Sequence, residues 1–192
     1  VEALYGLLEN KDVRADVFRF LVKFARDGGD DELLERSERR ALESFADDDF
    51  ERGAVLSDLA RLNRDVFKRD AEAADFAARA WRLDLTSDEA FDTAVDIARG
   101  LGSFEALLGE IDDAIATTSE DQPEIAVGIL IQKALLHFAE LEDPEGAGAT
   151  YEAALSLDPE HEGALDGLIE ILRDGDDAER LIHRLKARLA LT

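Results

Sequence analysis

Apolar residues recur at spacings of three and four along most of the chain, and this pattern constrains the fold more than any other feature. The clearest stripes are Phe18-Leu21-Val22-Ala25, Phe91-Ala94-Val95-Ala98 and Leu165-Leu168-Ile169-Leu172. This spacing follows one face of an α-helix, and no stretch alternates with the period of two that a half-buried strand requires. All three prolines fall at breaks between stripes, as expected for a residue that cannot continue a helix interior. We therefore predict an all-α chain of about eleven helices joined by short polar turns.

One stretch, from Gly128 to His161, carries a helix–turn–helix pattern of 34 residues. Its first helix is marked by Ile131, Ala134, Leu135 and Phe138, and its second by Ala147, Tyr151, Ala154 and the closing Pro159. The pattern resembles the tetratricopeptide repeat (TPR), a helical hairpin of this length. The resemblance implies a right-handed α-solenoid of antiparallel helix pairs. In it, small residues let helices approach closely and Tyr151 fills the gap between repeats.

Related frames cover most of the chain and predict a single TPR-like segment over residues 1–192, with about five repeats after a leading half-repeat. The approximate repeats are 15–48, 54–87, 88–121, 128–161 and 162–192. Residues Gln122 to Val127 are extra, and either lengthen the first helix of the fourth repeat or bend the stack. Because Val1 to Glu9 fits a second helix without its partner, we expect a segment excised from a larger bacterial TPR array. The alternative is a generic solenoid of helical hairpins.

The charge balance excludes several classes of partner. The chain has 22 Lys and Arg against 46 Asp and Glu, a formal charge of −24. Nucleic acids and anionic membranes are bound through clustered basic residues, so neither is an expected partner. No apolar run approaches the ~18 residues of a membrane helix, so no membrane insertion is expected. The low lysine content fits either a salt-adapted proteome or a genome that favours arginine codons.

No catalytic, cofactor-binding or metal-binding residues are predicted. The chain has no cysteine, and His137, His161 and His183 lie far apart without metal-ligand spacing. The carboxylate clusters at 27–31 and 47–51 lack the EF-hand pattern and are expected to cap helix starts. No phosphate-binding loop or nucleophile elbow is present. The lone Trp81 is expected to pack between repeats, and an enzymatic role for this segment is not expected.

The TPR resemblance also suggests where a partner would bind. In such arrays the first helix of each pair lines a concave groove, and the family frame projects particular residues into it. These positions hold Asp58, Leu62 and Asp65; Glu89, Asp92, Asp96 and Arg99; Ile129, Gln132 and Leu136; and Asp166 and Glu170. The basic clamp with which some family members hold acidic chaperone tails is therefore absent. A basic partner, or an apolar one near Ile129 and Leu136, is expected. The alternative is that the acids form a solvated face.

These observations predict a non-catalytic protein–protein interaction scaffold or adaptor, with a protein or peptide bound on the concave first-helix face. A regulatory or sensor module that controls an enzymatic or signalling domain outside the segment is one alternative, and a structural spacer is another. Uncovered apolar faces at both ends predict end-to-end self-association. A cytoplasmic location is favoured. A periplasmic lipoprotein stays open, since the sequence does not start at Met.

Overall fold

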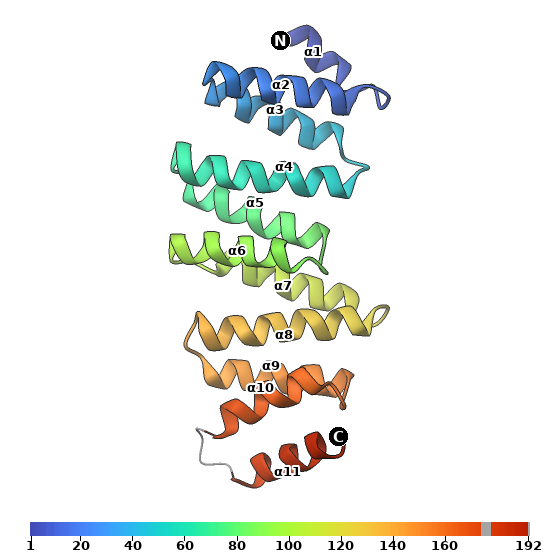
Figure 1. Ribbon diagram of the computed structural model, residues 1–192, viewed down its shortest axis with the longest axis vertical. Coiled ribbons are helices and arrows are strands. Elements are labelled where there is room, and N and C mark those ends of the chain that lie inside the picture. The colour runs from blue at the N-terminus through green and yellow to red at the C-terminus, as the bar shows by residue number, and fades with distance from the viewer. Residues whose placement is uncertain (174–177, 192) are drawn as a thin grey trace. The chain divides into compact units, whose positions relative to one another are not determined.

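The structure is a computed structural model that describes residues 1–173 and 178–191 (Figure 1). Within these ranges it contains eleven α-helices, one π-helical turn and no strand. The predicted all-α class and the arrangement in successive antiparallel helix pairs are confirmed, and the right-handed superhelix remains a prediction. Residues 174–177 and 192, which fall in the fifth predicted repeat, lie outside the described ranges. The chain divides into two compact units, unit 1 (Val1–Glu110) and unit 2 (Ile111–Thr192).

Unit 1 is a succession of helices in which each packs against the next in the chain. Its helices are α1 (Glu2–Leu7), α2 (Arg14–Gly28), α3 (Asp31–Ser44), α4 (Asp49–Leu62), α5 (Asp70–Leu83) and α6 (Asp88–Leu101), with the π-helical turn η1 (Asn63–Phe67) after α4. The division between the two units falls inside α7 (Glu105–Thr118).

Side chains and backbone at the turns explain why the helices of unit 1 begin and end where they do. Asp30, Asp48 and Ser87 are N-caps, and their side chains accept hydrogen bonds from the backbone N–H three residues on, at 2.9, 3.1 and 3.2 Å. Each cap satisfies an N–H that the first helical turn leaves free. Gly29 ends α2 with φ of 63°, a left-handed conformation that favours glycine. The predicted capping role of the two carboxylate clusters is thus confirmed at Asp30 and Asp48.

Small residues bring the helices of unit 1 together, as the repeat frame predicts. Ala60 on α4 and Ala73, Ala77 and Ala80 on α5 are all buried. Trp81 is fully buried at the end of α5, and its ring meets that of Phe91 on α6 edge to face at 5.7 Å. The expectation that this tryptophan packs between successive pairs is confirmed.

The π-helical turn η1 continues α4 and is held by one buried asparagine. The Asn63 side-chain amide donates to the Leu59 carbonyl at 2.9 Å, and the Asn63 carbonyl accepts from the Arg69 N–H at 2.9 Å. Lys68 then adopts a left-handed conformation with φ of 55°, which ends the turn. Helix α4 begins at Asp49, before the predicted repeat start at residue 54, and η1 extends it to Phe67.

Unit 2 contains the rest of α7 and four further helices. These are α8 (Pro123–Ala139), α9 (Pro144–Leu157), α10 (Glu162–Arg173) and α11 (Ala178–Leu189). Pro123 and Pro144 stand in the first turns of α8 and α9, where the missing N–H costs nothing. Most of the extra residues between Gln122 and Val127 belong to α8. They therefore lengthen the first helix of the fourth repeat, which was the first of the two expected alternatives.

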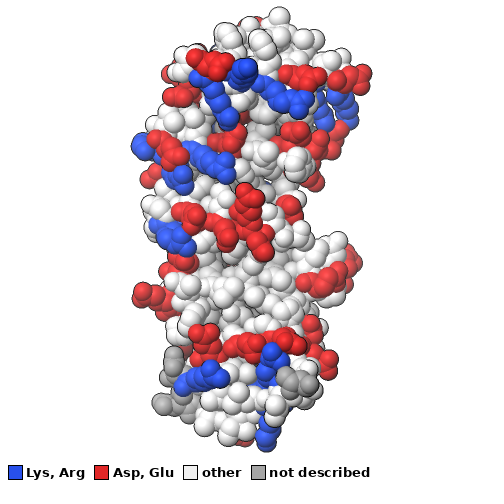
Figure 2. Space-filling model, in the orientation of Figure 1, with Lys and Arg blue, Asp and Glu red and all other residues white. Residues whose placement is uncertain are grey.

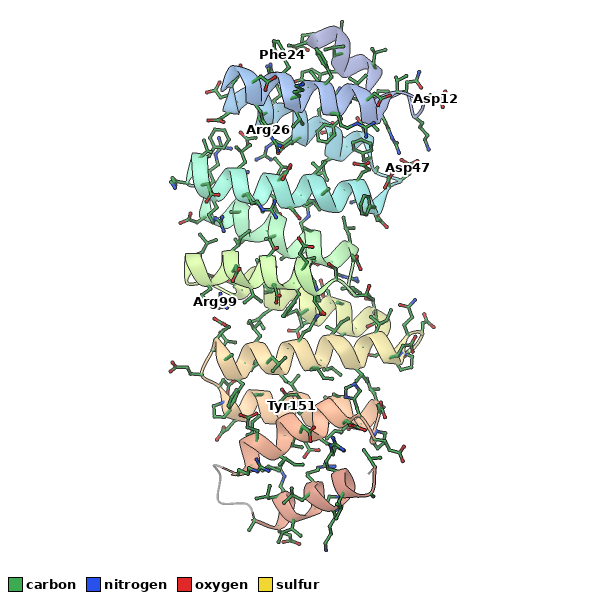
Figure 3. All side chains as sticks on the ribbon, viewed as in Figure 1. Asp12, Phe24, Arg26, Asp47, Arg99 and Tyr151 are labelled. Carbon is green, nitrogen blue, oxygen red and sulfur yellow. The ribbon has the colours of Figure 1, made fainter. Side chains whose placement is uncertain are left out.

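The core of unit 2 joins α8, α9 and α10. Ala134, Tyr151, Ala154 and Leu168 belong to one buried apolar cluster. Tyr151 lies between α9 and α10 (Figure 3), and a Cβ built on Gly167 would stand 2.4 Å from its Cζ. Tyr151 therefore fills the gap between successive pairs, as predicted, and only a glycine on α10 leaves room for its ring.

Two of the apolar residues that mark the repeat pattern in α8 are exposed. Leu135 is 51% exposed and Phe138 is 41% exposed, whereas Leu130 and Ala134 of the same helix are buried. At 100° per residue, Leu135 lies about 140° around the helix from Leu130, away from the buried face. Residues that match the repeat pattern therefore do not all lie in the core. Leu185 of α11 is also exposed.

Candidate partner-binding surface

In unit 1, the basic residues of α2 meet the acidic residues of α4. The Arg26 guanidinium lies 2.9 Å from one oxygen of Asp58, and Arg61 lies 3.6 Å from the other. Arg26 lies on the side of α2 toward α4, and Phe24 on the opposite side (Figure 3). Asp58 is therefore neutralised within the chain, and it ties two successive first helices together.

A pocket of about 240 Å³ opens beside this ion-paired cluster. Three of the residues predicted for partner binding, Asp58, Leu62 and Asp65, all line it. The structure thus brings together the whole predicted set from the second repeat. A second pocket of about 340 Å³ shares Arg26 and Asp58 with the first and is otherwise lined from α2 by Phe18, Arg19, Val22, Lys23 and Asp27.

The same pocket contains a residue that the sequence analysis missed, Glu38 of α3. Its side chain is 1% exposed, and neither carboxyl oxygen has a hydrogen-bond partner among the described residues. Burial raises the pKa of Glu38 to about 8; repulsion from Asp58 adds to the shift, and attraction by Arg26 opposes it. The sequence did contain a sign that Glu38 is buried: it lies four residues after Leu34 and three before Ala41, on the apolar face of α3.

Acidic side chains gather on the exposed face of α6, as Figure 2 shows, while Lys and Arg side chains lie over α2. Glu89, Asp92 and Asp96 are all exposed there, together with Arg99. Asp96 forms an ion pair with Arg99 at 2.5 Å, three residues on. No ion pair involves Glu89 or Asp92 within the described ranges, so these two carboxylates are the uncompensated acids of this helix.

On α8 in unit 2, the predicted binding residues lie mostly inside the protein. Ile129 is 1% exposed and Leu136 is 2% exposed, while Gln132 is partly exposed. Neither Ile129 nor Leu136 presents a surface that a partner could contact. The large apolar side chains that α8 does expose are Leu135 and Phe138, which also mark the repeat pattern.

On α10, the two predicted acids are exposed and differ in their surroundings. Asp166 accepts a hydrogen bond from Arg188 of α11 at 2.9 Å. Glu170 has no ion-pair partner in the parts of the chain that are described. It lies close enough to Tyr151 to add to the rise in the pKa of that phenol, which comes first from burial. Glu170 thus resembles Glu89 and Asp92 as an uncompensated carboxylate on a first helix.

Exposed apolar side chains also occur on α2 of unit 1 and on α11 of unit 2. Phe20 and Phe24 on α2 are each more than half exposed, and their rings stack 6.2 Å apart with an angle of 13° between planes. Ile182, Leu185 and Leu189 are the exposed apolar residues of α11. Stacked aromatic rings in solvent are costly to leave uncovered, so the α2 pair is the stronger candidate for a contact surface.

Groups able to do chemistry are not assembled anywhere in the described residues. No three His, Cys, Asp or Glu residues there are placed to hold a metal ion. The closest histidine–carboxylate pair, His137 Nδ1 to Asp143 at 3.0 Å, lies at the turn between α8 and α9. Asp143 is an N-cap as well; the N–H of Gly146 and then His137 lower the pKa of its carboxyl. None of the helices described is long and apolar enough to cross a membrane.

Comparison with known proteins gives structural matches only. A crystal structure of MamA protein matches with a TM-score of 0.49 and 17% identity, covering 96% of this chain and 92% of that one. A crystal structure of BtubC (BKLC) from P. vanneervenii matches with a TM-score of 0.46 and 19% identity, covering 99% and 87%. No family model and no curated protein sequence matches the chain. Since both TM-scores are below 0.5, neither match bears on function.

Proposed function

We propose that this chain is a non-catalytic scaffold for protein–protein interaction, and that its partner binds along the exposed faces of the first helices α2, α4, α6, α8 and α10. A tandem array of helix pairs offers a long surface with few enclosed cavities, which suits a protein or extended peptide better than a small substrate. The uncompensated carboxylates Glu89 and Asp92 on α6 carry the proposal, because they specify a basic partner.

The partial neutralisation of the other acids sharpens this preference. Asp58, Asp65, Asp96 and Asp166 are already paired with arginines of the chain. A basic partner would gain most from the acids that have no such pair, which are Glu89, Asp92 and Glu170. Complementary charge of this kind accelerates encounter and selects partners.

An apolar contact on the partner has a natural place at α8. The predicted apolar residues Ile129 and Leu136 are buried, so this role passes to Leu135 and Phe138. They lie three residues apart and are neighbours on the exposed face of the helix, so one apolar side chain of a partner could contact both.

A charge-reversal pair tests the proposal. Asp92→Lys should weaken binding of a labelled basic peptide at low salt by about fivefold or more, since two unit charges ~4 Å apart in water interact by about 1 kcal/mol. The matched control is Asp113→Lys on α7, an exposed acid on a second helix whose reversal changes the net charge equally. Fluorescence anisotropy measures both. If both variants weaken binding to the same extent, the effect is one of net charge and the proposed surface is wrong.

A second role, end-to-end self-association, is favoured by the stacked Phe20 and Phe24. Covering this pair by another copy would remove two half-exposed aromatic rings from water. Light scattering at rising concentration should show association that Phe20→Ser with Phe24→Ser abolishes. A wild-type chain that stays monomeric at millimolar concentration would end this proposal and leave the first untouched.

A further inference from the structure

Glu38 is a buried acid whose carboxyl oxygens accept no hydrogen bond from the described residues. It lies on α3 with 1% of its surface exposed. The nearest cation is the guanidinium of Arg26, 3.9 Å from Oε1, which is beyond hydrogen-bonding distance. A buried polar group without a partner is unusual in a folded protein and requires an explanation.

Among the described residues, intramolecular pairing supplies only this long contact. Both arginines of the pocket, Arg26 and Arg61, are directed to Asp58 on α4. Asp65 of η1 pairs with its neighbour Arg64, and Glu35 on α3 pairs with Arg39 and Arg69. Each of these charged groups therefore has a closer partner, and among the described residues Glu38 is left with only the long contact to Arg26 at 3.9 Å.

The pocket in front of Glu38 has the size and lining for one side chain. At about 240 Å³ it is smaller than the clefts of roughly 300–1,000 Å³ that enclose whole small ligands. Leu34, Leu62 and Val66 supply an apolar wall. The only deeply buried polar group in the lining is the Glu38 carboxyl, so the pocket combines an apolar wall with an acidic end.

We propose that this pocket receives a lysine side chain of the basic partner, whose ammonium group pairs with the Glu38 carboxylate. The four-carbon stem of lysine would lie along the apolar wall, and the compact ammonium would donate to the carboxyl oxygens. A guanidinium is planar and wider, and would compete with Arg26 and Arg61 for the same mouth. The inference rests on the proposed function, since it names one residue that the basic partner must carry.

Proton release should accompany the binding. Glu38 holds a proton at neutral pH because its pKa is raised to about 8, and an arriving ammonium favours the ionised form. Lysine affinity should therefore fall about tenfold for each pH unit below 8. The charged groups around it are Arg26, Arg61, Asp58, Asp65 and Glu35.

The test uses three small probes and the intact protein. N-acetyl-lysine methylamide should shift the methyl NMR signals of Leu34, Leu62 and Val66 in the wild-type chain, with an affinity that falls from pH 8 to pH 6. The norleucine analogue keeps the stem without the charge, and the arginine analogue changes the charged group. Both should bind at least about tenfold more weakly. Equal shifts with norleucine, or tighter binding of arginine, would overturn the assignment.

Two variants separate this site from the α6 surface. Glu38→Gln should abolish the pH dependence and most lysine binding, while Glu43→Gln, the same change at an exposed site on α3, should do neither. The wild-type pH series needs no variant, so the test survives a misfolded Glu38→Gln. If Glu38→Gln binds the lysine probe as the wild type does, the inference fails. If basic peptide still depends on Asp92 in that case, the proposed function stands without it.

Discussion

The raised pKa of Glu38 makes a quantitative prediction about stability. The unfolded chain ionises this carboxyl near its ordinary value of 4.5, and the folded chain only near 8. Between these values the folded state binds more protons than the unfolded state, so stability from this group is lost as pH rises from about 4.5 to about 8. The separation of about 3.5 units corresponds to a loss of about 5 kcal/mol as an upper limit, at 1.36 kcal/mol per unit.

Glu38→Gln should remove this dependence because an amide does not titrate. The free energy of unfolding of the variant minus that of the wild type should therefore rise by several kcal/mol, up to about 5, between pH 4.5 and pH 8. Any constant cost of the unpaired amide cancels in this comparison. The contributions of carboxylates distant from Glu38 are the same in both proteins and cancel as well. At pH 7 alone the rise should already be about 3 kcal/mol as an upper limit.

Urea unfolding followed by tryptophan fluorescence is the appropriate assay. Trp81 is the single tryptophan, is fully buried, and lies in the same unit as Glu38. Glu43→Gln is the control, since its exposed carboxyl pairs only with Arg40 at the surface and should leave the pH profile unchanged. A difference between Glu38→Gln and wild type that stays constant from pH 4.5 to pH 8 would refute the reasoning.

Three further substitutions test the packing and capping described above. Gly128→Ala, in a helix with open space around the glycine, should stabilise the protein by about 0.5–1 kcal/mol. The free energy of unfolding of Gly167→Ala, measured by thermal or urea unfolding, should be about 1–3 kcal/mol lower than that of Gly128→Ala, because the new methyl group meets the ring of Tyr151. Equal stability of the two variants would contradict this contact. Asp30→Ala should cost about 1 kcal/mol by removing an N-cap, and Asp31→Ala, which removes no cap bond, should cost less by the same measurement.

The sequence was most informative where small residues set helix spacing. Alanines at 60, 73, 77, 80, 134, 147 and 154 are all buried, because close helix approach admits few other side chains there. On α8, by contrast, the repeat pattern did not show that Leu135 and Phe138 are exposed. A helix that begins five residues before the predicted repeat start contains more apolar residues than its buried face can hold. Spacing alone cannot say which of them face solvent.

The binding surface was predictable only in outline. Asp58, Leu62 and Asp65 were selected by position, and the structure places all three in one pocket. Glu38 was missed because the frame assigned only first-helix residues to the groove, whereas this side chain reaches the pocket from a second helix. Which acids are neutralised could not be read from sequence either, since partners such as Arg26 and Asp58 lie 32 residues apart.

The contact between Tyr151 and Gly167 bears on how such an array can be rearranged. The ring of Tyr151 on α9 requires a glycine at the facing position of the next helix pair, which Gly167 on α10 provides. If the α8–α9 hairpin were duplicated or moved before a pair with a larger residue at that position, its tyrosine would have no space. Neighbouring hairpins are therefore matched rather than interchangeable. Exchanging the order of two hairpins would therefore require substitutions on both of them. The order of the hairpins is fixed by these facing side chains and not by the loops that connect them.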